Sequence, residues 1–118
     1  MFNVERPISV SEVRHGFGTF FDDVRWLYNL TFNKNEKAYK VEDVKRYSNE
    51  LFEANHISEY IHLIIEEAIQ KFASLHPANL KKMEPNDLVK LNKWISISIG
   101  DINSEISELI HYMNKRSI

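Results

Sequence analysis

The feature that most constrains the fold is a repeat of apolar positions within residues 47–75. The repeat alternates steps of four and three residues, and only Ser58 interrupts the series Tyr47, Leu51, Ala54, Ser58, Ile61, Ile65, Ala68, Phe72 and Leu75. Because this spacing places one side chain per turn along one side of an α-helix, it indicates packed helices rather than sheet. We predict one helix that begins between residues 35 and 41, runs unbroken through residues 47–75 and stops at Pro77. A fresh helix capped by Asn55 is the alternative.

The chain before this repeat carries a helix-start signal followed by two glycines. Ser9 and Glu12 match a capping box, in which the serine hydroxyl and the glutamate satisfy each other's backbone amides at a helix start. A glycine costs about 1 kcal/mol inside a helix, and two occur at positions 16 and 18. We therefore predict a short helix that ends near His15 and a second helix from Thr19 to about Phe32.

A second long apolar stripe follows Pro85, a residue suited to the first turn of a helix. Its members are three or four residues apart throughout: Leu88, Leu91, Ile95, Ile99, Ile102, Ile106, Leu109 and Met113. The alternation in residues 95–99 also fits a strand, but such a strand has no partner in the sequence. We therefore predict an all-α fold: an up-and-down bundle of three or four antiparallel helices, one or two of them long, in a single domain over residues 1–118.

Composition narrows the function classes. The chain has 118 residues with 43% hydrophobic content, which is enough for one domain with a core of its own. It has no cysteine, so disulfides, thiolate metal sites and thiol nucleophiles are excluded. We see no secretory signal and no run of about 20 apolar residues, so we expect a cytoplasmic protein without a membrane span. A net charge of -2 gives no general attraction to nucleic acid, which we do not expect as a partner.

The sequence pattern that most resembles a metal site involves the histidines. Four of them follow a glutamate by three residues, in the pairs Glu12/His15, Glu53/His56, Glu59/His62 and Glu108/His111. Glutamate and histidine at this spacing share a helix face and are ligands in helical di-iron proteins. At 100° per residue, however, the last pair lies roughly 140° to 160° from the apolar stripe, on the solvent side. Only Glu53 and His56 remain as metal-ligand candidates, and we predict no metal and no cofactor.

No other catalytic pattern stands out. Acidic pairs such as Glu50 with Glu53 are common on charged helices, and the lysines are interspersed with acidic residues. We find no glycine-rich phosphate loop, no serine–histidine–aspartate order and no zinc-ligand spacing. A metal-dependent bundle enzyme with Glu and His ligands, or a nucleic-acid-associated helical protein, stays as the alternative.

Apolar residues outside the two stripes suggest a contact surface. Trp26 and Leu30 project opposite the apolar side of their helix, and Trp94 and Ile97 fall off the stripe that follows Pro85. Tryptophan is enriched at the energetic centres of protein interfaces. We therefore predict a small helical protein that acts by protein contact, as an adaptor, inhibitor, immunity-type or assembly subunit. Its interface would use Trp26, Leu30, Trp94 and Ile97 to bind a protein partner or a second copy, with completion of the core as the competing role of the two tryptophans.

Overall fold

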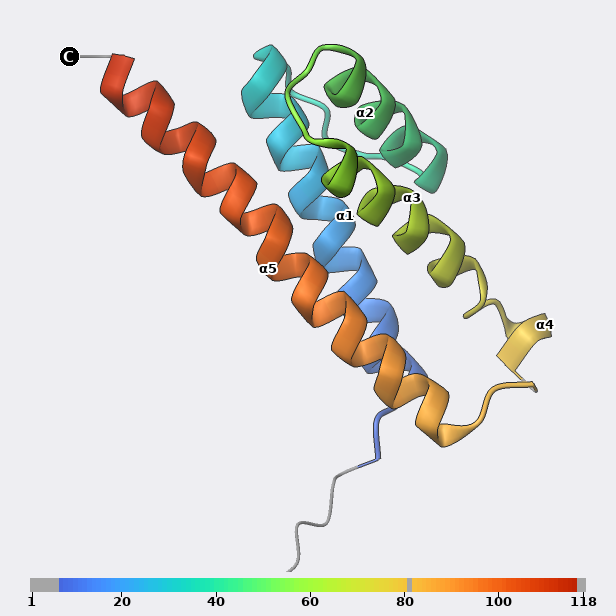
Figure 1. The fold of residues 1–118 in the computed structure, drawn as a ribbon. Coiled ribbons are helices and arrows are strands. Elements are labelled where there is room, and N and C mark those ends of the chain that lie inside the picture. Colours follow the sequence, from blue (N-terminus) through green and yellow to red (C-terminus); the bar gives the residue numbers. More distant parts are fainter. Residues whose placement is uncertain (1–6, 81, 117–118) are drawn as a thin grey trace, which may run out of the picture.

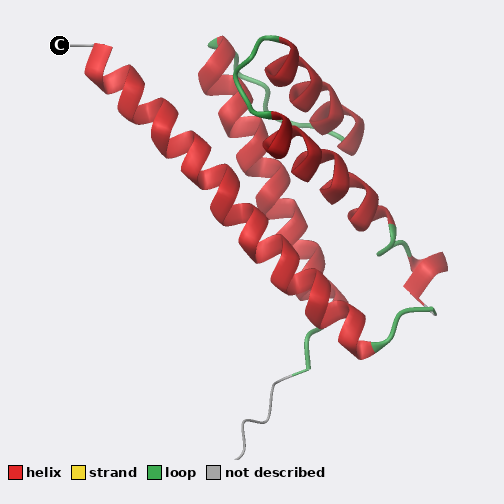
Figure 2. Cartoon of the chain, viewed as in Figure 1, coloured by secondary structure: helices red, strands yellow, loops and turns green. Residues whose placement is uncertain are grey.

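The computed structural model describes residues 7–80 and 82–116, in which helices joined by short connections are present and no strand occurs (Figures 1 and 2). The helices are α1 (Val10–Phe32), α2 (Val41–Glu53), α3 (Glu59–Ala73), the single turn α4 (Pro77–Leu80) and α5 (Pro85–Arg116). This confirms the predicted all-α class and the long helix that begins at Pro85. None of the helices in the described part of the chain combines the length and apolar character that crossing a bilayer requires.

The connection after α1 doubles back along that helix. The Tyr39 hydroxyl donates a hydrogen bond of 2.5 Å to Asp22, which lies in the middle of α1. From there α2 runs in the same direction as α1, and the rings of Tyr28 and Tyr47 stack with centroids 4.4 Å apart. Figure 1 shows that α5 also runs parallel to α1, whereas α3 runs opposite to both. The sequence predicts that neighbouring helices are antiparallel. This is true of α3 with α5 and of α2 with α3, but α1 is parallel to both α2 and α5 (Figure 1).

The first helix continues through its glycines, so the predicted break between His15 and Thr19 is wrong. α1 spans Val10–Phe32 without interruption. A Cβ atom added to Gly16 would lie 3.0 Å from Cγ2 of Ile95, so the glycine allows α5 to pack closely against α1. Phe17, Phe20 and Phe21 are buried beside it. Burial of each aromatic ring contributes about 1.5 to 3 kcal/mol, which outweighs the helix penalty of the glycines.

The predicted continuous helix through residues 47–75 is also wrong, because the chain reverses at residues 54–58. α2 ends at Glu53, and Asn55 adopts a left-handed backbone with φ of 59° rather than capping a new helix. Ser58 is the cap instead, since its hydroxyl accepts a hydrogen bond of 3.2 Å from the amide of Ile61. The one polar interruption of the apolar repeat therefore marks the start of α3.

Three local predictions are confirmed. The Ser9 hydroxyl accepts a hydrogen bond of 3.1 Å from the amide of Glu12 and caps α1. α5 begins at Pro85, and it stays helical through residues 95–99 and through Gly100. The core lies where α1 meets the other three long helices, and its largest fully buried side chains include Tyr28, Tyr47, Phe17, Phe20, Leu51, Ile65, Leu75, Ile95 and Ile102.

Candidate functional site: an exposed apolar face on α3 and α5

Three strongly exposed apolar side chains lie on α3 and α5, two helices that contact one another. Ile97 is 66% exposed, Tyr60 62% and Leu63 56%, and they are three of the four most exposed large hydrophobic residues in the described part of the chain. We call the surface formed by Tyr60, Leu63 and Ile97 the α3–α5 face. Large apolar side chains left in water on neighbouring helices are typical of a surface that binds another molecule.

One hydrogen bond fixes the register of the helices that carry this face. The Tyr60 hydroxyl donates a hydrogen bond of 3.1 Å to Asp101 in α5. Leu63 lies about one turn after Tyr60, and Ile97 lies about one turn before Asp101. Because α3 and α5 are antiparallel (Figure 1), both steps go in the same direction along the seam. Leu63 and Ile97 therefore lie at the same level, one on each helix.

The inward positions of both helices are already occupied, which is why these side chains stay outside. Ile61 and Ile65 of α3 are buried, as is Ile95 of α5. At 100° per residue, Ile97 projects about 200° away from Ile95, on the opposite side of the helix. Leu63 likewise projects about 200° away from Ile61. Since one side of a helix can face the core, the additional apolar residues of each segment must face solvent.

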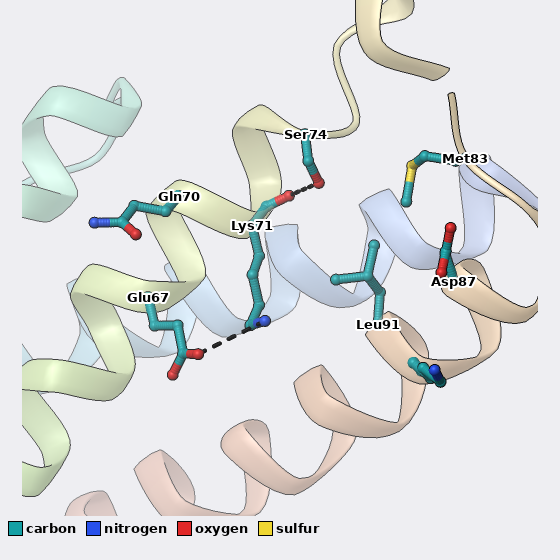
Figure 3. A pocket seen from close by; sticks show the side chains of 8 residues that line it. Glu67, Gln70, Lys71, Ser74, Met83, Asp87 and Leu91 are labelled. Atoms are coloured by element: carbon teal, nitrogen blue, oxygen red, sulfur yellow. Dashed lines mark hydrogen bonds and ion pairs between the residues drawn. The ribbon is translucent and has the colours of Figure 1, made fainter. Parts of the chain in front are cut away.

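A hollow continues this face toward the start of α5. Figure 3 shows its lining, with Glu67, Gln70 and Lys71 from α3, Ser74 at the C-terminal cap of α3, and Asp87 and Leu91 from α5, beside Met83. The hollow measures about 450 Å³, and the Lys71 ammonium lies 3.6 Å from the Glu67 carboxylate. Two acidic and two basic side chains line it, since Lys90 is also present. This balance favours neither an anion nor a cation as a ligand.

The four residues predicted as an interface divide into two pairs. Trp26 is 47% exposed, and Leu30, one turn later, is half-buried and packs against the core. Trp94 is also half-buried, stacks on Phe17 at 6.3 Å and lies under the Lys71 ammonium, whereas Ile97 is exposed. Gly16 of α1 faces Ile95, and Trp26 lies ten residues after Gly16. Trp26 therefore lies about 15 Å further along the bundle than Trp94 and Ile97.

Tyr60 and Leu63 were missed as contact residues at the level of sequence. Within residues 57–65 the sequence is ISEYIHLII, which holds more apolar side chains than one inward stripe can take. That excess is the signal that could have identified them. It was hidden because the predicted continuous helix gave no direction to α3 relative to α5.

The metal-ligand candidates do not come together. Glu53 ends α2 and His56 lies in the following connection, where its ring meets the Phe32 ring edge-on at 5.6 Å. Both side chains are exposed. His62 Nδ1 lies 2.9 Å from the Ser48 hydroxyl instead, and its ring stacks on Phe52. Within residues 7–80 and 82–116, no three His, Asp or Glu side chains are grouped so that they could hold a metal ion.

Acidic charge accumulates near the end of α5. Partial burial and the neighbouring Glu108 raise the pKa of Glu105 above its usual value. His56, Glu105, Glu108 and Tyr112 line a hollow of about 190 Å³ on this side of the bundle. Residues 101–108 of α5 thus form an acidic segment, whereas Lys90 and Lys93 lie before it and Lys115 and Arg116 follow it in the last turn.

No protein-family model, curated protein or solved structure matches this chain. Its function is therefore inferred from its own residues. Among the described surfaces, the α3–α5 face combines strong apolar exposure with a fixed geometry.

Proposed function

We propose that this chain is a non-enzymatic helical protein that binds a protein partner through the α3–α5 face, in the manner of an adaptor, inhibitor, immunity-type or assembly subunit. The observation that carries the proposal is the exposure of Tyr60, Leu63 and Ile97 at one seam between two helices. Burial of Leu63 and Ile97 against a partner contributes about 1.5 to 3 kcal/mol each, before the entropy lost on association is subtracted.

The rigidity of the face supports the same proposal. Its residues lie on α3 and α5, and buried side chains of both helices, such as Ile65 and Ile102, belong to the common core. The Tyr60 hydroxyl is already held by Asp101, so its ring loses little freedom on binding. A surface that is ordered before binding keeps more of its contact energy as affinity. Tyrosine is also one of the residue types that dominate interface energetics.

Affinity purification of the full-length tagged chain from its native host tests the proposal. The variants Leu63→Glu and Ile97→Glu place a charge in the face without touching the core. Tyr112→Glu is the matched control, because Tyr112 is 57% exposed and lies in the last turns of α5. Trp26→Glu tests the second exposed aromatic site separately. Circular dichroism checks that helicity persists in each variant.

We expect a protein retained by the wild-type chain to be lost, by at least about tenfold, with Leu63→Glu and with Ile97→Glu. The control Tyr112→Glu retains it. Equal retention by all variants contradicts the proposal, and so does equal loss in the control. If only Trp26→Glu loses the retained protein, the binding surface lies on α1 instead.

A further inference from the structure

α5 carries a second repeat on the side that faces away from the bundle. Its members are spaced alternately four and three residues apart and are all exposed: Lys93, Ile97, Gly100, Ser104, Ser107 and His111. We call this row the outer seam of α5. Its spacing is the one by which two helices pack along their length. Its central residues are small, so a second helix can approach closely there.

Gly100 has no role in the packing of its own chain. A Cβ atom added there would have no heavy atom within 4 Å, whereas one added to Gly16 would touch Ile95. A glycine in the middle of a helix costs about 1 kcal/mol relative to alanine. Gly18 of α1 is equally open, so a glycine alone does not identify a contact. The charges that flank Gly100 supply the second observation.

Lys90 and Glu108 lie on either side of the centre of the outer seam. They are eighteen residues apart, which is five helical turns, so they project from the same edge of α5 about 27 Å apart. Both are exposed, and neither forms an ion pair within the described ranges. When α5 is placed beside an antiparallel copy of itself, Lys90 of each copy meets Glu108 of the other. The midpoint of this pairing lies at residue 99, next to Gly100.

We propose that the outer seam binds a second copy of this chain, with the two α5 helices antiparallel and Gly100 beside the two-fold axis. Lys90 and Glu108 form two symmetric ion pairs across this contact, and Ile97 of each copy packs over Gly100 of the other. Such a contact is isologous, the commonest kind in homodimers. The inference rests on the proposed function in one respect, because both surfaces use Ile97 as a contact residue.

Charge also decides the direction of the pairing. In a parallel pair Lys90 would face Lys90 and Glu108 would face Glu108, and like charges in contact are unfavourable. In the antiparallel pair, Glu108 and Glu105 of each helix lie level with Lys90 and Lys93 of the other. The lysine of the second copy would also offset the repulsion between Glu108 and Glu105, which lie near one another.

Charge reversal tests the pairing in the purified full-length chain by sedimentation equilibrium. The wild-type chain is expected at twice the monomer mass of 14.0 kDa at sub-millimolar concentration. Lys90→Glu and Glu108→Lys should each weaken the dimer by at least about tenfold, and the double variant should restore it. A wild-type chain that stays monomeric overturns the inference. A dimer that neither single reversal weakens also overturns it.

Single cysteines test the direction, because the natural chain has none. In the antiparallel pair, Gly100→Cys brings its two sulfurs close to the axis, where a disulfide forms under oxidation. Ser107→Cys is the matched exposed control, and its two sulfurs lie about 24 Å apart along the helices, too far to cross-link. Cross-linking of Gly100→Cys alone supports the inference. Equal cross-linking of both variants indicates a parallel pair and overturns it.

The outcomes also separate this inference from the proposed function. If Leu63→Glu and Ile97→Glu abolish retention of a different protein while the purified chain stays monomeric, the proposed function stands and the second copy is excluded. If the purified chain forms a dimer that the double charge reversal restores, the inference stands whatever other protein is retained.

Discussion

The two sides of α5 put the same residue type to opposite uses. Ile95 and Ile102 are each 1% exposed against the rest of the bundle, whereas Ile97, two residues from Ile95, is 66% exposed. Two glycines differ in the same way, since a Cβ atom added to Gly16 of α1 would lie 3.0 Å from Ile95, whereas one added to Gly100 of α5 would meet no heavy atom within 4 Å. Apolar or small character therefore does not by itself identify the core. The direction of each side chain relative to neighbouring helices decides whether it stabilises the fold or remains for a partner.

The largest expected effect separates the two isoleucines. Ile102→Ala should lower the free energy of unfolding by about 2 to 5 kcal/mol, because it leaves a cavity in a packed core. Ile97→Ala should change the free energy of unfolding of the monomer by less than about 0.5 kcal/mol, because the exposed side chain makes few contacts that the substitution would remove. Urea denaturation measures both changes in the free energy of unfolding. It is carried out at protein concentrations where further dilution does not shift the midpoint of unfolding. Similar losses for the two variants would break the comparison.

The two glycines should respond to alanine with opposite signs. Gly100→Ala should raise the free energy of unfolding of the monomer by about 0.5 to 1 kcal/mol, because it improves helix propensity at an open site. Gly16→Ala meets Ile95, and a steric cost of about 1 to 3 kcal/mol exceeds the same helix gain, so a net loss of about 1 kcal/mol is expected. Thermal denaturation by circular dichroism distinguishes them. Stabilisation by Gly16→Ala would show that Ile95 moves aside freely.

The smallest expected effect concerns the acidic end of α5. The pKa of Glu105 is raised above its usual 4.5 by partial burial and by Glu108. A carboxyl that holds its proton more tightly when folded lowers stability as the pH rises past the unfolded value. Glu105→Gln should therefore raise the free energy of unfolding at neutral pH by about 0.5 kcal/mol or less, since solvent screens this group.

Urea denaturation at neutral and acidic pH checks this prediction. The gain should disappear at about pH 3, where Glu105 is protonated in both the folded and the unfolded chain. Glu66→Gln in the middle of α3, away from the helix ends, is the control and should change stability little at either pH. A gain for Glu105→Gln that persists at low pH would indicate that side-chain shape, rather than charge, is responsible.

Much of the helical structure could be predicted, but not its interruptions. The Ser9 cap, the start of α5 at Pro85 and the continuity of α5 followed from local signals. The reversal at residues 54–58 did not, because the apolar repeat keeps its spacing across the turn. Spacing reports which residues are buried, and α2 and α3 both bury their repeat positions in the same core. Ser58 is the one polar residue in this repeat, but the repeat alone does not indicate that Ser58 caps a helix.

Of the three residues that form the α3–α5 face, only one could be predicted from the sequence. Ile97 was expected at a contact surface because it falls off the stripe of its own helix, which is a local property. Tyr60 and Leu63 become part of the same surface through the antiparallel register that the Tyr60 to Asp101 hydrogen bond records. Trp94 also falls off the stripe, yet Phe17 and Lys71 reach it from two other helices. The angular position of a residue on its own helix does not reveal which side chains of other helices reach it.

The sequence by itself determined that the chain is helical, where α5 begins and most of the residues that each helix buries, because periodicity and capping act over a few residues. Only the tertiary structure decided that α1 and α5 run in the same direction and that α2 and α3 are separate. It also decided, through the Tyr60 to Asp101 hydrogen bond, that Leu63 and Ile97 share a level. Those features depend on how one helix meets another, as at Gly16 and Ile95, and contacts across the chain set that geometry.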